Sequence, residues 1–81
     1  MTLTELGAEL AAARKARHLS QTDLARASGV SRQSISLLER GAITDLGVRK
    51  LMRVLEVLDL EFVVRPVGHP LTLDDLRPKS A

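Results

Sequence analysis

Residues 21–40 form the stretch QTDLARASGVSRQSISLLER, whose spacing predicts two short helices joined by a tight turn. Two helices that cross at a steep angle need a small side chain where they touch, and Ala25 supplies one. The chain must then reverse within a few residues, which favours a residue that tolerates positive φ, and Gly29 lies at that point. Three apolar residues continue at helical spacing and turn one side of the second helix inward: Val30, Ile35 and Leu38. The stretch therefore predicts a helix-turn-helix.

The outward side of the second helix carries mostly side chains that can form hydrogen bonds. In a major groove, Arg32 can pair in bidentate fashion with guanine and Gln33 with adenine. Leu37 has two interpretations, a contact with a thymine methyl group or a partly covered surface leucine. The residues expected to meet DNA on this side are Ser31, Arg32, Gln33, Ser36, Leu37 and Arg40, of which Arg40 is assigned to a phosphate.

The start of the first helix of the pair is a second candidate contact. Helix N-termini offer free N–H groups and the positive end of the helix dipole, which suits a phosphate. Gln21 lies there and can hydrogen-bond a phosphate, which would hold the motif in register on the duplex. Arg14, Lys15 and Arg17 end the preceding helix, where they either complement its dipole or touch phosphates.

The net charge of +2 conceals an asymmetry between the two parts of the chain. Residues 1–53 carry nine basic and five acidic side chains, a balance of +4, whereas residues 54–81 carry three and five, a balance of −2. The basic part contains the helix-turn-helix, and this coincidence favours a polyanionic partner. The sequence therefore predicts binding to double-stranded DNA.

Composition excludes several other classes of protein. With 81 residues the chain holds one domain, and with Phe62 as its single aromatic residue the core must be aliphatic. The absence of cysteine excludes disulfides and Cys-ligated zinc, and no metal or other cofactor is expected. The first basic residue is Arg14 and no apolar run approaches the roughly 18 residues of a membrane span, which predicts a cytoplasmic protein without a membrane partner.

Local signals place the remaining helices. Thr2 and Glu5 form a T-x-x-E capping box before a helix over residues 3–17, in which Gly7 is unfavourable. Ser20 caps the helix over residues 21–27. Ser31 caps the next helix, which ends at Gly41, and Thr44 caps a helix over residues 45–58 whose apolar surface exceeds one packing seam.

A change of period follows the last helix. Leu60, Phe62 and Val64 alternate with other residues before Pro66, which predicts a strand. A single strand leaves its backbone N–H and C=O groups without partners, so pairing with a second copy across a two-fold axis is the expected solution. An extended segment packed across its own helices is the alternative. The residues assigned to dimerisation are Leu58, Leu60, Phe62 and Val64.

The chain divides into a folded domain, residues 1–65, and a tail, residues 66–81. The tail holds all three prolines and little periodicity, which predicts flexibility. Leu71, Leu73 and Leu76 are candidates for a short docking motif within it.

Residues 3–58 resemble the phage-repressor (Cro/C1, or Xre) class of helix-turn-helix domains. Residues 6–66, with LARASGVSRQSISLLERG, DLGVRKLMRVLEVLDLEF and the terminal strand, resemble HipB-type antitoxins. The resemblance implies a mainly α domain of four to five helices, a homodimer closed by paired terminal strands, repression of its own operon at an inverted repeat, and binding to a HipA-type kinase toxin. In phage repressors the positions matching Gln21, Arg32, Gln33 and Leu37 touch DNA, often as glutamines. This chain departs at Arg32 and Leu37, so an operator sequence does not follow from the resemblance.

Four other functions compete with an autoregulating antitoxin. A stand-alone repressor or restriction-modification controller of this size usually dimerises through helices alone, and the strand at residues 60–64 argues against it. A protein-binding module without DNA contact conflicts with the polar, basic outward side of the recognition helix. An enzyme is the least favoured, because His69, Asp74 and Asp75 lie in the tail without rigid support. RNA recognition is disfavoured by the lack of aromatic residues on which bases stack.

Overall fold

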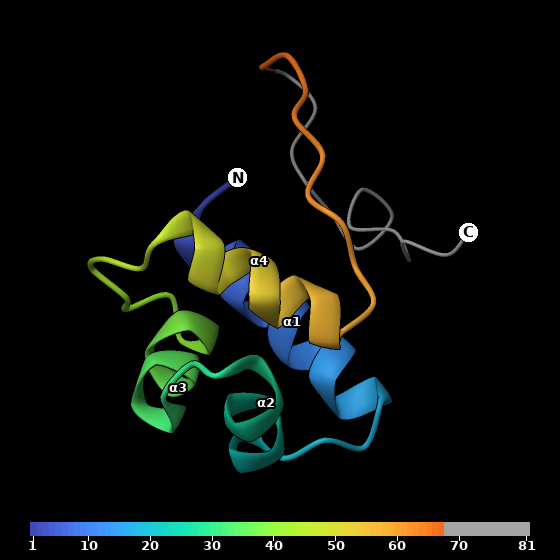
Figure 1. Ribbon diagram of the computed structural model, residues 1–81. Coiled ribbons are helices and arrows are strands. Elements are labelled where there is room, and N and C mark those ends of the chain that lie inside the picture. The colour runs from blue at the N-terminus through green and yellow to red at the C-terminus, as the bar shows by residue number, and fades with distance from the viewer. Residues whose placement is uncertain (68–81) are drawn as a thin grey trace.

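Four α-helices make up the regular structure of residues 1–67, the part of the chain that the computed structural model describes (Figure 1). Figure 1 shows α2 and α3 side by side at the lower side of the view, with α4 and α1 above them. Both α1 and α2 pack on α3, and α2 also packs on α4. The expected mainly α fold is therefore confirmed. The helices are α1 (Leu3–Ala16), α2 (Gln21–Ser28), α3 (Arg32–Glu39) and α4 (Val48–Val57).

The first three helices begin where their capping residues predict. The side chain of Thr2 accepts a hydrogen bond from the Glu5 N–H at 3.1 Å, and that of Ser31 accepts one from the Ser34 N–H at 3.1 Å. Ser20 and Asp23 cap each other, since each side chain accepts the other residue's N–H at 2.9 Å. Hydrogen bonding with Ser20 lowers the pKa of Asp23, with the larger effect from the backbone N–H of Ser20 and a smaller one from its hydroxyl group. These satisfied N–H groups fix the starts of α1, α2 and α3.

The start of α4 differs from its prediction. The helix begins at Val48 with Gly47 as its N-cap, which has no side-chain hydrogen bond, so the assignment of Thr44 as the cap was wrong. Ile43 and Leu46 explain the difference, because both are partly buried against the core from a non-helical loop. Covering the core from that loop takes residues 43–46 out of the helical register.

The observed ends of the other helices differ from the predicted ends by one or two residues. Arg17 is the C-cap of α1 and Ser28 is the last residue of α2. Gly29 follows α2 in the left-handed region with φ of 74°, as the predicted turn requires. The last helical residue of α3 is Glu39, two residues before Gly41, whose φ is 70°.

Ten aliphatic side chains form the core of the described residues. The three residues predicted to turn inward after Gly29 are all buried, with Ile35 0% exposed. Leu58 and Leu60, which were assigned to dimerisation, are only 1% and 7% exposed within their own chain. The core therefore draws on every helix and on the segment after α4. Its members are Leu6, Leu10, Leu24, Val30, Ile35, Leu38, Val54, Leu55, Leu58 and Leu60.

Gly7 allows α1 and α3 to approach each other closely. A Cβ atom at this position would meet the backbone carbonyl oxygens of Leu38 and Glu39, the latter at 2.6 Å. These are backbone atoms at the end of α3, which cannot rotate away as a long side chain can. The glycine that is unfavourable for the helix in isolation is therefore required by the packing of α1 against the end of α3.

The chain leaves the helices after Leu60. The Leu60 N–H closes the end of α4 by donating to the Leu55 carbonyl at 2.8 Å, and residues 61–67 then extend away from the helices (Figure 1). The expected strand at residues 60–64 is not formed in the single chain, because no other strand among residues 1–67 can pair with it. Leu60 packs in the core, but beyond it the segment is only partly covered by its own helices, since Phe62 is 45% and Val64 86% exposed. Pairing across a dimer stays a prediction.

Part of the sequence interpretation lies outside the described residues. It comprises most of the expected tail, with the leucines 71, 73 and 76 and the polar residues His69, Asp74 and Asp75. Within residues 1–67, no helix has the length and apolar character needed to cross a membrane.

Candidate nucleic-acid interface

The surface of α3 carries the side chains predicted to meet DNA. Arg32 and Gln33, in its first turn, are exposed, and Ser31 before them is exposed as the N-cap. Ser36 and Leu37 are half-buried, so the second turn presents a narrower surface than the first. Ile35 and Leu38 occupy the opposite side of the helix in the core. The structure thus brings the predicted base-reading side chains together on one side of a helix whose other side is fully packed.

Arg40 ends this surface. It is exposed and serves as the C-cap of α3, and its Nε lies 3.4 Å from the Ser36 carbonyl oxygen. That carbonyl is among the last of α3, where a cation is favoured by the helix dipole. The guanidinium therefore lies at the end of the helix, one turn beyond Ser36, at a position suited to a phosphate that flanks the groove.

Gln21 makes a contact within the protein that the sequence did not predict. Its side-chain Nε2 donates to Oε1 of Glu39 at 3.1 Å, which joins the start of α2 to the end of α3. The side chain is only half-buried, so the phosphate contact predicted for Gln21 stays a prediction. The observed hydrogen bond adds a second role, because it orients α2 and α3 relative to each other.

Glu39 is the centre of a network that fixes the end of α3. Arg14 donates from Nε to Oε2 of Glu39 at 2.6 Å and from Nη2 to Oε1 at 3.0 Å, and its Nη1 donates to the Leu19 carbonyl at 2.7 Å. The two side chains are 10% and 7% exposed. A bidentate pair shielded from water is both strong and geometrically specific. Arg14 therefore ties α1 and the loop after it to α3.

The ionisation of this pair follows from its surroundings. Burial raises the pKa of Glu39, but the hydrogen bonds from Arg14 and Gln21 and the charge of Arg14 outweigh it, so the net pKa is lowered. The hydrogen bond to Glu39 raises the pKa of Arg14 against the opposing effect of burial. Both groups are charged at neutral pH, and the end of α3 is held by an ion pair rather than by neutral hydrogen bonds.

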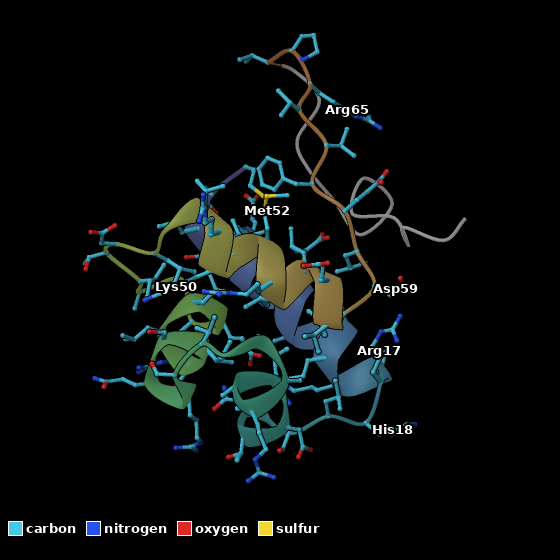
Figure 2. All side chains as sticks on the ribbon, in the orientation of Figure 1. Arg17, His18, Lys50, Met52, Asp59 and Arg65 are labelled. Carbon is cyan, nitrogen blue, oxygen red and sulfur yellow. The ribbon has the colours of Figure 1, made fainter. Side chains whose placement is uncertain are left out.

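Arg14 lies in the last turn of α1, as its interpretation as a cation that complements the helix dipole expects, but its guanidinium is not presented to solvent. The residue is only 8% exposed and is paired with Glu39, which disfavours the alternative interpretation of Arg14 as a phosphate contact. Lys15 and Arg17 remain exposed at the end of α1. Figure 2 shows Arg17 and Asp59 on the side of the molecule away from α3, and their side chains lie 3.6 Å apart.

Glu39 and Gly7 are the functional positions that the sequence did not reveal. Both support α3 through contacts between residues that are far apart in the sequence. Arg14 and Glu39, for example, are 25 positions apart. A glycine inside a helix pattern was the one available signal, since it is costly unless something approaches closely.

Comparison with known proteins agrees with this geometry. The Helix-turn-helix family profile matches residues 10–64, and the chain therefore belongs to the helix-turn-helix family. An uncharacterized HTH-type transcriptional regulator, y4dL of Sinorhizobium fredii, is 41% identical over 58 residues. That match covers 72% of this chain but only 29% of the relative, so this chain corresponds to a minor part of that protein's length.

Two solved structures are similar in fold. The restriction-modification controller protein C.AhdI from Aeromonas hydrophila superposes with a TM-score of 0.68 at 32% identity, covering 73% of this chain and 88% of that one. A chain of the SinR protein/SinI protein complex superposes with a TM-score of 0.63 at 31% identity, covering 68% of this chain and 53% of that one. None of the three names is that of an enzyme.

Proposed function

We propose that this protein is a transcriptional repressor that binds an inverted repeat in double-stranded DNA as a two-fold dimer. In this proposal α3 enters the major groove, Arg32 and Gln33 contact base edges, and Gln21 and Arg40 contact phosphates. Ser31, Ser36 and Leu37 complete the surface that faces the groove. The two copies of α3 lie one helical turn of DNA apart, about 34 Å, so that each enters one of two successive major grooves.

One observation carries the proposal: the exposed side of α3 is polar and basic while the rest of the helix is fixed. Arg32, Gln33 and Arg40 are exposed, whereas the inner side and the end of the helix are held by the core and by the Arg14–Glu39 pair. A helix that reads base edges needs this combination, because a fixed scaffold places a few side chains at defined positions.

The test is selection of bound duplexes from a randomised library, followed by titration of the selected duplex. The proposal expects an inverted repeat, and Arg32→Ala should lose about 1–3 kcal/mol of binding free energy per half-site and relax base preference there. Arg17→Ala is the matched control, because it removes the same charge far from α3 (Figure 2) and should leave base preference intact. Equal losses on all sequences would make Arg32 a phosphate contact, and a library without any enriched duplex would contradict the proposal.

The biological setting has two candidates. An antitoxin that represses its own operon and binds a HipA-type toxin is supported by the resemblance of residues 6–66 to HipB-type proteins. A restriction-modification controller is supported by the likeness to C.AhdI, which this chain covers almost throughout. Both candidates use the same DNA-binding surface, so they differ in the second partner and not in α3.

The neighbouring gene separates the two candidates. A HipA-like kinase gene beside this one, whose product co-purifies with the protein, is the outcome expected for an antitoxin. A restriction endonuclease gene whose promoter binds the protein is the outcome expected for a controller. If neither of these genes lies beside this one, a stand-alone repressor is the remaining candidate.

A further inference from the structure

The outer side of α4 exposes apolar side chains that the rest of residues 1–67 leaves uncovered. Val48 is 71% exposed and Met52 50%, and Phe62, which follows the helix, is 45% exposed. Beside them lies a groove of about 290 Å³, lined by Met52, Leu55, Glu56, Leu60, Glu61 and Phe62. Figure 2 shows Met52 on the side of α4 away from α2 and α3. Contact at this surface therefore leaves the exposed side of α3 accessible.

Charge along α4 is strongly divided. Arg49, Lys50 and Arg53 lie in the first six residues of the helix, whose last turn carries no basic residue. Glu56 follows near its end, and Glu61 lies on the same groove. The rim of the apolar groove is thus acidic, while the start of the same helix is basic. A groove of this kind fits an apolar side chain flanked by positive charge, and the start of α4 in another copy offers that combination.

Helical spacing aligns these features on one surface. Val48, Met52 and Glu56 are four residues apart and follow a single stripe along α4, and Arg49 lies beside that stripe, three residues before Met52. If two copies of α4 cross near Met52 in opposite directions, Arg49 of each lies near Glu56 of the partner subunit. A two-fold axis forms this contact twice.

We infer that a second copy of this chain covers this surface, with the two α4 helices crossing near Met52 and with reciprocal Arg49–Glu56 contacts between protomers. The inference deepens the proposed function, on whose two-fold dimer it rests, by naming the surface that joins the protomers. Apolar contact between Met52, Phe62 and their counterparts supplies affinity, and the charge pattern fixes the direction in which the helices cross.

The test is the dimer dissociation constant of the full chain, measured by sedimentation without DNA. Met52→Asp should raise it about thirtyfold or more, as for a residue at the centre of an interface, with unchanged circular dichroism because the side chain is half-exposed. Arg49→Glu and Glu56→Arg should each raise it about tenfold, and the double variant should recover to within about threefold of the native value.

Lys50→Glu is the matched control. It makes the same charge change as Arg49→Glu, but Figure 2 places Lys50 on the opposite side of α4 from Met52, so the dissociation constant should not change. A dimer that survives Met52→Asp, or a double charge swap without recovery, would overturn the inference. Loss of the dimer in Val63→Pro but not in Met52→Asp would also overturn it, by assigning the interface to paired strands.

Failure of the inference and failure of the proposed function give different results. A Met52→Asp protein that stays dimeric and still binds an inverted repeat overturns only the α4 surface. A native dimer that Met52→Asp dissociates, but that binds no duplex, supports the surface and contradicts the DNA-binding function. A native chain that stays monomeric even at high concentration overturns both the α4 surface and the two-fold dimer of the proposed function.

Discussion

Glu39 at the end of α3 and Asp59 just after α4 each lie beside an arginine from the end of α1, yet the two ion pairs differ in exposure and geometry. Arg14 and Glu39 are 10% and 7% exposed and make a bidentate pair, whereas Arg17 and Asp59 are 44% and 41% exposed and lie 3.6 Å apart. Around the first pair, α1 and α2 pack closely on the end of α3 through Gly7, Gln21 and the core. On the outer side of α4, away from the second pair (Figure 2), Met52 and Phe62 are 50% and 45% exposed.

The difference shows how a chain of this size separates its tasks. The helix proposed to meet DNA is fixed by contacts inside the domain, so that its outward side chains have defined positions before any duplex binds. The surface at α4 is left with apolar side chains, which suits association with another molecule. Perturbing each region in turn tests whether the contrast is real.

The largest effect is expected from breaking the buried pair. Arg14→Met keeps the length of the side chain but leaves the Glu39 carboxylate buried without its cation, which should lower the free energy of unfolding by about 3–5 kcal/mol. Urea denaturation followed by circular dichroism measures this loss. A change of under about 1 kcal/mol, the range of exposed pairs, would show that the pair is no different from one on the surface.

A smaller but still large loss is expected from Gly7→Ala. The added methyl group meets the backbone at the end of α3, so α1 and α3 must separate, at a cost of about 1–3 kcal/mol as for an overpacked core. Ala8→Gly is a useful contrast, since Ala8 is exposed on the same helix and should lose about 1 kcal/mol from helix propensity alone. A Gly7→Ala protein more stable than the native one would contradict the close approach.

Acid should weaken the network around Glu39. Because its pKa in the folded protein lies below the ordinary 4.5, Glu39 stabilises the fold fully above that pH, and the contribution is lost as the pH falls through the lowered pKa. The free energy of unfolding should fall less steeply below this pH in Glu39→Gln than in the native protein. Asp23, whose pKa is also lowered, contributes equally to the pH dependence of both proteins, so the difference between their profiles reports on Glu39. Superimposable pH profiles would contradict this assignment.

The smallest effect is expected at the exposed pair. Arg17→Met should change the free energy of unfolding by about 0–1 kcal/mol, because solvent screens charges that are more than a third exposed. The same denaturation measurement compares it directly with Arg14→Met. If the two variants lost equal stability, the contrast between the two regions would not hold.

Local features of the fold were predictable and distant ones were not. Thr2, Ser20 and Ser31 identified three helix starts correctly because a cap and the N–H groups it binds are three residues apart. The turn at Gly29 followed from the same short-range logic. Thr44 failed as a cap, because packing of the loop from Ile43 to Leu46 on the core decided where α4 begins.

The candidate site divides in the same way. Helical spacing was enough to separate the outward residues of α3 from Ile35 and Leu38. It could not reveal that Arg14 binds Glu39, because that contact depends on how α1 and α3 pack. For the same reason Leu58 and Leu60 were assigned to dimerisation from their pattern, although their side chains are buried in their own chain.

The most direct test of DNA binding through α3 is the salt dependence of affinity for duplex DNA, measured by fluorescence anisotropy. The logarithm of the association constant should fall linearly with the logarithm of salt concentration, by about 0.9 for each phosphate contact. In Arg40→Ala the slope should be smaller by about one for each α3 that is bound. A native protein without salt-dependent binding, or an Arg40→Ala slope equal to the native one, would contradict the account.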